Sequence, residues 1–342
     1  MIFCILTIMS FKNLNNKPFE VSVAPMMGWT DRHCRWFHRQ LSTRVRLYTE
    51  MVVADAVIHG DRDYLIGFDA VEHPVALQIG GSDPAKLAEA ARIGADYGYD
   101  EININIGCPS DRVQSGAFGA CLMQEPELVA TCYAAMANAV DVPVTVKCRL
   151  GVDDQRVEET LPHFLSTVSQ VGCTQFIIHA RKAWLKGLSP KENRDVPPLD
   201  YGLVRQMKQD FPSLTIALNG GLADLDVAQT EARGLDGIML GRAAYHTPWI
   251  LSAVDEEIYG ERASGLNRDM IVEKLIDYAA ARESTDRTTK ALIRHIMGLY
   301  AGEPGARLWR RTLSERLVAK TRPSEIIRQA HVAYQNQNRY AA

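Results

Sequence analysis

The stretch Asn103-Ile104-Asn105-Ile106-Gly107-Cys108-Pro109-Ser110 is an apolar strand that runs into a sharp turn. Isoleucine alternates with asparagine along it, which predicts a half-buried strand whose end is fixed in position. Gly107 and Pro109 are typical turn residues, so we expect the turn to present Cys108 at the C-terminal end of the strand. Two interpretations of Cys108 remain open here, a reactive thiol or a small buried hydrophobe, because free cysteine is among the most buried residue types.

Seven other short runs rich in β-branched residues lie on either side of this strand. With it, the predicted strands are 21–25, 46–52, 74–80, 101–108, 142–151, 175–180, 215–221 and 237–242. Most are separated by helical stretches with their own start signals, such as Asp83-Pro84 before 85–97, Glu125-Pro126 before 127–140 and Asp224 before 225–233. This alternation predicts parallel βαβ units, and eight strands predict a closed (β/α)8 TIM barrel.

A doubly wound open sheet is the alternative architecture. Nucleotide-binding sheets of that kind carry Gly-x-Gly-x-x-Gly directly after the first strand. The first strand of this chain ends instead in Ala24-Pro25-Met26-Met27-Gly28, so the barrel is favoured.

The β signal stops after Tyr259-Gly260, and only helical patterns follow, at 269–283, 288–301, 307–319 and 324–334. We therefore expect three parts in the chain. They are a disordered extension at 1–17, a TIM barrel at 18–255 and a smaller all-helical domain at 256–342.

The composition is that of a globular protein with a full core, since 46% of the 342 residues are hydrophobic and 23% are charged. The seven cysteines include no Cys-x-x-Cys pair, and an odd number argues against a disulfide framework, so we expect a reducing, cytoplasmic location. Residues 1–9 are apolar but lack a basic flank and are far shorter than a membrane span. We expect neither a membrane contact nor a metal site.

Charge is distributed unevenly along the chain, although its formal net charge is only −3. Residues 285–342 hold 11 Lys and Arg against 4 Asp and Glu, whereas residues 1–284 hold 27 against 37. The excess of positive charge indicates a polyanion contact made by the C-terminal part. A solvated basic helical face is the plainer alternative.

Polar and sulfur-containing residues stand at the C-terminal ends of the predicted strands, where an ordinary barrel core has Val, Ile and Leu. In a (β/α)8 barrel the site is built from residues at these ends, so they predict its position. They are Pro25-Met26-Met27, Glu50-Met51, Gln78, Asn103 with Asn105 and Cys108, Lys147 with Arg149, His179 with Arg181, Asn219-Gly220-Gly221 and Gly241-Arg242.

Glycines after the seventh and eighth predicted strands, together with Arg242, indicate a bound phosphate. A cation, an amide and an imidazole from Lys147, Gln78 and His179 would surround a ring, with Met26 and Met27 as its apolar seat. This combination predicts flavin mononucleotide (FMN), held by Pro25, Met26, Met27, Gln78, Lys147, His179, Asn219, Gly220, Gly221, Gly241 and Arg242. Two alternatives stay open: a salt bridge from Lys147 to Glu50, and a core role for His179.

Cys108 then becomes the candidate proton donor beside a redox cofactor. A cysteine with an ordinary pKa of about 8.5 is mostly thiol at neutral pH and can act as a general acid.

The same residues resemble the motifs of the tRNA-dihydrouridine synthases, over about residues 19–334. The first-strand signature is 24–31, the catalytic loop is 105–109, and 147–149, 179–181, 219–221 and 241–242 are similar to the flavin-site motifs in the same order. Residues 179–194 resemble most the bacterial A-type branch of this family.

The resemblance implies a reaction and a partner. NADPH reduces the flavin, the flavin passes a hydride to carbon 6 of a uracil, and Cys108 protonates carbon 5 from the other face. The A-type targets are the tRNA D-loop uridines labelled 20 and 20a, which must leave their stack to react. Asn105 would hydrogen-bond the flipped base, although a strand-end amide satisfied by backbone is the alternative.

The resemblance also implies that Lys191, Arg194, Arg307 and Arg310 orient the tRNA. Helical spacing puts Arg311 on the same face as Arg307 and Arg310, where the three side chains would bind phosphates. We expect a monomer. Two rival functions remain open, a TIM-barrel FMN reductase of a small unsaturated substrate and a tRNA-binding protein without catalysis.

Overall fold

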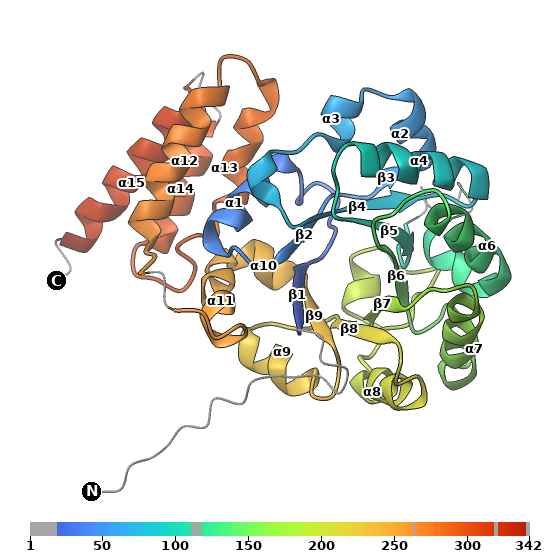
Figure 1. Cartoon of the computed structure of the whole chain (residues 1–342). Helices are drawn as coiled ribbons and strands as arrows, with labels where there is room; N and C mark the ends of the chain where they lie inside the picture. The colour runs from blue at the N-terminus through green and yellow to red at the C-terminus, as the bar shows by residue number, and fades with distance from the viewer. Residues whose placement is uncertain (1–18, 111–115, 117, 263–264, 318–320, 340–342) are drawn as a thin grey trace, which may run out of the picture.

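The computed structural model describes residues 19–110, 116, 118–262, 265–317 and 321–339. In this part of the chain, eight parallel strands form a closed barrel that helices surround, and a helical C-terminal region lies beside it (Figure 1). The predicted (β/α)8 barrel is therefore confirmed. The extension expected at residues 1–17 lies outside the described residues.

The barrel closes between its first, second and last strands. β1 (Glu20–Val23) pairs with both β2 (Arg46–Tyr48) and β9 (Gly237–Leu240), and β2 also pairs with β4 (Val75–Gly80). The remaining strands follow in chain order: β5 (Glu101–Ile106), β6 (Val144–Arg149), β7 (Gln175–His179) and β8 (Thr215–Asn219). Because every pairing is parallel, the C-terminal ends of all eight strands form one rim.

One predicted strand is shorter than expected. The run at 46–52 divides into β2 and a two-residue strand, β3 (Val52–Val53), which pairs with the end of β4. Between them the Thr49 side chain accepts a hydrogen bond from the Gln78 N–H at 3.0 Å, while Glu50 and Met51 turn into the rim cavity. A side-chain acceptor thus replaces the backbone ladder where the chain leaves the sheet.

The strand that decides the fold is buried on both faces, so the expectation of a half-buried strand was wrong. The alternation of Ile and Asn along this strand places the two residue types in two different buried environments, one on each face of the sheet. Ile102, Ile104 and Ile106 belong to the main hydrophobic core, whereas Asn103 and Asn105 bond to polar side chains of neighbouring strands. The apolar cluster of the interior is small, comprising Ala24, Tyr48, Ala76, Ile177 and Met239.

Helices cover the outside of the barrel, and most begin at an aspartate or a proline. Asp83 accepts from the N–H groups of Ala85 and Lys86 with Pro84 at the first turn, and Asp224 accepts from Val227 N–H, as their start signals predict. The helices are α1 (Arg32–Leu41), α2 (Ala54–His59), α3 (Arg62–Ile66), α4 (Pro84–Asp96), α6 (Pro126–Ala137), α7 (Val157–Gln170), α8 (Tyr201–Asp210), α9 (Leu225–Glu231), α10 (Arg242–His246) and α11 (Val254–Glu257).

The C-terminal region is helical, as predicted, but one predicted helix is mostly absent. α12 (Arg268–Arg282), α14 (Ala306–Leu317) and α15 (Pro323–Arg339) match their patterns, whereas 288–301 contains only a 3-10 turn and α13 (Leu292–His295). The interrupted stretch contains Gly298, a poor helix former. A Cβ at that position would lie 2.4 Å from the His246 carbonyl oxygen, so glycine lets this turn approach α10 closely. Within the described residues, no helix is both long and apolar enough to cross a bilayer.

The helical region is attached to the barrel rim through α1 (Figure 1). Asp31 caps α1 through the N–H groups of His33 and Cys34, and its second oxygen accepts from both Arg294 and His295 at 2.9 Å. The His33 ring bonds to the Tyr278 hydroxyl at 2.9 Å. One aspartate therefore joins the start of a barrel helix to α13, which brings the helical region to the C-terminal rim.

Candidate active site at the barrel mouth

A cavity of about 1790 Å³ opens at the C-terminal rim of the barrel. Every strand end that was singled out in the sequence contributes at least one residue to its wall, although Asn103 and Arg181 do not line it, and residues between 286 and 294 of the helical region complete it. All the residues predicted to hold FMN line the cavity: Pro25, Met26, Met27, Gln78, Lys147, His179, Asn219, Gly220, Gly221, Gly241 and Arg242. Cys108, Asn105 and Arg194 line it as well, so one site contains most of the predicted residues.

Cys108 is held by the side chain of Asn105. The Asn105 Oδ1 atom accepts from the backbone N–H groups of Gly107 and Cys108, both at 3.0 Å. The half-buried thiol donates to Ser110 Oγ at 3.4 Å, and the Cys108 carbonyl accepts from Ala120 N–H at 2.9 Å. These bonds fix the turn and leave the thiol at the cavity wall, which favours the reactive interpretation over the buried hydrophobe.

The amide of Asn105 continues into a row of buried polar side chains. Its Nδ2 atom donates to Gln78 Oε1 at 2.7 Å, and Gln78 Nε2 donates to Asn103 Oδ1 at 2.8 Å. Asn103 then donates to Thr145 Oγ1 at 2.7 Å, and Thr145 donates to Glu101 at 2.5 Å. Because each bond fixes an amide's orientation, the row positions Gln78 and Asn105 for a ligand. Asn105 thus bonds both to backbone N–H groups and to the Gln78 side chain, which is close to the alternative of a strand-end amide satisfied by backbone.

Lys147 places an ammonium in the wall without a carboxylate partner among the described residues. Its Nζ donates to Asn219 Oδ1 at 3.1 Å, and Asn219 Nδ2 donates to the Met239 carbonyl at 2.7 Å. Burial, followed by the positive charge of Arg149, lowers the pKa of Lys147 to about 8. The salt bridge to Glu50 is not formed, since Glu50 accepts from the Gly28 N–H instead. An ammonium with this environment is suited to an electron-rich or anionic ligand.

His179 lies level with Arg149 and Asn219 in the sheet register. Burial, and then the charges of Arg149 and Lys147, hold its pKa well below the ordinary range, so the ring is neutral at physiological pH. Gly220 has φ +110°, and a Cβ at that position would lie 2.5 Å from the imidazole Cδ2. Glycine is therefore required for the loop after β8 to approach the ring.

Arg242 closes the same side of the cavity. Its Nη1 pairs with Asp195 at 2.6 Å, and both side chains remain partly exposed. A phosphate at Gly220, Gly221 and Gly241 would lie near an arginine that a neighbouring carboxylate already orients.

The predicted RNA-contacting residues are divided between two surfaces. Arg194 lines the cavity, and Lys191 is exposed on the same loop between β7 and α8. Arg307, Arg310 and Arg311 are exposed on α14 and do not line the cavity. Their positions three and four residues apart put them on one side of that helix, as the spacing predicts.

Several residues of the site were missed by reasoning from the sequence. Arg287 and Arg294 line the cavity from the helical region, and Ser110 accepts from the Cys108 thiol. Trp29 also lines it, stacked on Tyr245 with ring centroids 4.3 Å apart. No local pattern could have found Arg287 and Arg294, because their positions depend on contacts between distant segments. Ser110, by contrast, lies two residues after Cys108, and this short spacing was a local signal for its contact with the thiol.

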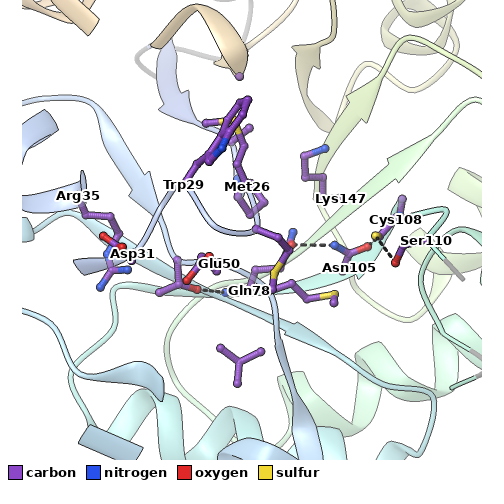
Figure 2. A pocket seen from close by; sticks show the side chains of 18 of the residues that line it. Met26, Trp29, Asp31, Arg35, Glu50, Gln78, Asn105, Cys108, Ser110 and Lys147 are labelled. Atoms are coloured by element: carbon purple, nitrogen blue, oxygen red, sulfur yellow. Dashed lines mark hydrogen bonds between the residues drawn. The ribbon is translucent and has the colours of Figure 1, made fainter. Parts of the chain in front are cut away.

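The arrangement separates chemical roles across the cavity. Figure 2 shows Lys147, Asn105, Cys108 and Ser110 on one side, Asp31, Arg35 and Glu50 on the other, and Met26 and Trp29 between them. In the described part of the chain, no group of three or more His, Cys, Asp or Glu residues could hold a metal ion. A thiol can donate a proton here to a planar group that lies in the cavity.

A closed (β/α)8 barrel with a polar rim cavity and a positioned thiol is typical of TIM-barrel enzymes. The chain belongs to the dihydrouridine synthase (Dus) family, whose model matches residues 22–336. This result confirms the resemblance inferred from the motifs.

Two relatives with curated names are similar over most of the chain. The tRNA-dihydrouridine(20/20a) synthase of Shewanella oneidensis is 51% identical, over 95% of this chain and 96% of the relative. The protein of the same name from Vibrio parahaemolyticus is 55% identical, over 86% of this chain and 91% of the relative. A solved complex of 2-naphthoyl-CoA reductase has a TM-score of 0.53 at 13% identity, covering 69% of this chain and 50% of that chain, which shows a common fold alone.

Proposed function

We propose that this chain reduces uridine to 5,6-dihydrouridine in the D-loop of tRNA, at positions 20 and 20a, with bound FMN and with NADPH as reductant. The family and the names of the two relatives support the reaction and the positions. The single observation that carries the proposal is the Cys108 thiol, fixed by Asn105 at the wall of a cavity that also contains Lys147 and His179.

The residues of the cavity fit FMN. Gly220 and Gly221 both have positive φ, and a Cβ on either would collide with a neighbouring side chain, so their backbone can approach a phosphate where a larger residue could not. Arg242 adds a cation beside them, and Gln78, Lys147 and His179 offer donors for a ring. When bound and reduced by NADPH, FMN would supply the hydride for carbon 6 of the uracil.

Cys108 holds the proton for carbon 5 on its Sγ atom. The hydrogen bond to Ser110 orients the thiol, and the two N–H bonds to Asn105 keep the turn in place. After transfer the sulfur is left as a thiolate, which recovers a proton from solvent. One N–H of the Asn105 amide donates to Gln78, and the second N–H would donate to the flipped base.

The RNA would contact the β7–α8 loop and α14. Lys191 and Arg194 would contact the D-arm next to the cavity, while Arg307, Arg310 and Arg311 would bind phosphates farther along the tRNA. The enzyme would act in the cytoplasm as a monomer, on tRNA whose target base has left its stack.

The test compares tRNA with small acceptors. The purified, FMN-loaded protein is given NADPH with an unmodified tRNA transcript, free uracil or 2-cyclohexenone, and NADPH oxidation is followed. We expect sustained oxidation with tRNA alone. Rapid turnover of a small acceptor without tRNA would instead support a small-molecule reductase, and tRNA binding without oxidation would support a binding protein.

A further inference from the structure

Arg149, the last residue of β6, is a buried cation that the proposed chemistry does not yet use. It is 3% exposed, and no carboxylate in the described part of the chain pairs with it. Burial of a guanidinium without a carboxylate partner costs free energy, and its three hydrogen bonds must offset that cost.

The three bonds join two segments that lie far apart in the sequence. The Nε atom donates to the Gly107 carbonyl at 2.8 Å, directly before Cys108. The Nη1 atom donates to the carbonyls of Lys182 at 3.2 Å and Asn193 at 3.1 Å, both in the β7–α8 loop. A planar guanidinium has a fixed fork of donors, so it sets the distance between the catalytic turn and that loop.

The β7–α8 loop is itself rigid around Asn193. This side chain is fully buried; its Oδ1 accepts from Trp184 N–H at 2.7 Å, and its Nδ2 donates to the carbonyls of Trp184 at 2.9 Å and Leu188 at 3.1 Å. Lys191 and Arg194 lie on either side of Asn193 in the sequence. A shift of the attachment at Arg149 would therefore displace the cations proposed to contact RNA.

The charge of Arg149 also acts on the thiol. Burial lowers the pKa of Arg149 to about 10, and the charge interaction with a Cys108 thiolate opposes that shift. When Cys108 protonates a substrate carbon, the S–H bond breaks, a C–H bond forms and the electron pair stays on sulfur. A nearby buried cation stabilises the thiolate that results.

We propose that Arg149 is a positioning residue that holds the Cys108 turn and the β7–α8 loop in one fixed arrangement, so that RNA bound to the loop presents its base to the thiol. This inference rests on the proposed function. It assigns to one side chain the coupling between RNA contact and proton donation.

The experiment uses the full-length, FMN-loaded protein and its Arg149→Lys and Arg149→Met variants. Lysine keeps the charge but cannot reach three carbonyls, whereas methionine removes both the charge and the bonds. Turnover on tRNA gives kcat and KM. Separately, the rate of iodoacetamide alkylation of Cys108 at one fixed pH is measured by peptide mass spectrometry, and the half-buried Cys121 in the same protein serves as internal control.

We expect Arg149→Lys to lose about 10- to 100-fold in kcat and to show a higher KM for tRNA, because a small misplacement is costly in catalysis. The rate of Cys108 alkylation should rise in both variants, because the turn that holds the thiol loses its bond to the Arg149 guanidinium. Cys121 alkylation should be unchanged in both variants.

Turnover of Arg149→Lys within twofold of the wild type would overturn the inference, since one ammonium would then suffice. Loss of turnover with an equal change in the alkylation of Cys121 would also overturn it, because that pattern indicates general unfolding. If Arg149→Met does not fold, the result for Arg149→Lys decides. A wild type that makes no dihydrouridine would instead overturn the proposed function, and the alkylation rates, which need no tRNA, keep the two failures apart.

Discussion

The barrel mouth and the basic side of α14 both carry polar residues that the proposed function uses, but they are built in opposite ways. At the mouth Gln78, Asn103 and Asn105 are buried and bonded to one another. On α14, Arg307, Arg310 and Arg311 are exposed. Arg311 forms an ion pair with Glu315 at 3.8 Å, one turn farther along the same helix. The first set can fix an atom in place, whereas the second can supply only attraction.

This difference predicts how each region responds to change. Buried, mutually bonded groups act as a unit, so a single substitution should disturb the whole site. Exposed cations act almost independently and are screened by salt, so their losses should be small and additive. The predictions below test this contrast, from the largest expected effect to the smallest.

Cys108→Ala should lower the rate of uridine reduction by about 10²- to 10⁴-fold, the usual contribution of a positioned general acid. The reductive step with NADPH should be unchanged, because the thiol is not needed for it. Stopped-flow absorbance of the flavin measures both steps. Cys132→Ala is the matched control, since that residue is on the buried side of α6 and does not line the cavity. Comparable oxidation of reduced flavin by tRNA in both variants would contradict the assignment.

Lys147→Met should weaken FMN binding about 10- to 100-fold, because one charge-assisted hydrogen bond is lost. The pKa of Lys147 is lowered to about 8, so the ammonium is present below that pH and lost above it. Wild-type affinity should therefore fall as pH rises above 8, and the variant should show no such fall. Flavin fluorescence titrations across pH measure this, with the exposed Lys274→Met as control.

The same lysine predicts a trend in the stability of the flavin-free protein. Its folded pKa lies below its unfolded value of about 10.4, so the unfolded state binds more protons between these two values. Stability contributed by this group should rise with pH through that window. Urea denaturation of wild type and Lys147→Met at several pH values would expose the trend, and parallel curves would contradict it.

Asp31→Asn tests the contact between α1 and α13, and it should lower the free energy of unfolding by about 1–3 kcal/mol. The bonds of the carboxylate to Arg294 and His295 lose their charge, while the amide can still cap α1. Burial alone would raise the pKa of Asp31, but the hydrogen bond and charge of His295 hold it well below the ordinary value. The stabilisation is thus complete above about pH 4 and is lost as pH falls further.

Urea unfolding of Asp31→Asn should therefore approach that of the wild type in acid. Asp154→Asn, in an exposed turn, is the control. A difference that stayed constant below pH 4 would show that Asp31 does not stabilise the contact between α1 and α13 through its charge.

Arg307→Ala and Arg310→Ala should each weaken tRNA binding only about 2- to 10-fold, as expected for exposed phosphate contacts. Each should reduce the slope of log affinity against log salt by about one, and the double variant should show the sum. Filter binding at several salt concentrations measures this, with Arg92→Ala on α4 as control. An unchanged slope in the double variant would place the RNA surface elsewhere.

Much of this molecule follows from its sequence because periodicity and parallel topology place residues without knowledge of side-chain contacts. Once the strands are found, Gln78, Lys147, His179 and Asn219 must meet at one rim. The bonds among them were not predictable, since Asn105 reaches Gln78 only through the register that pairs Gln78 with Asn103. Contacts between distant segments were missed for the same reason, including Asp31 with Arg294 and Gly298 with His246.

The most direct test of the central claim is to locate the product. The purified, FMN-loaded protein is incubated with NADPH and an unmodified tRNA transcript that carries uridines at 20 and 20a, and nuclease fragments are weighed by mass spectrometry. We predict a gain of two hydrogens on the fragment that contains these uridines, largely absent with Cys108→Ala. A wild type that leaves every fragment unreduced, or that reduces a uridine outside the D-loop, would contradict the account.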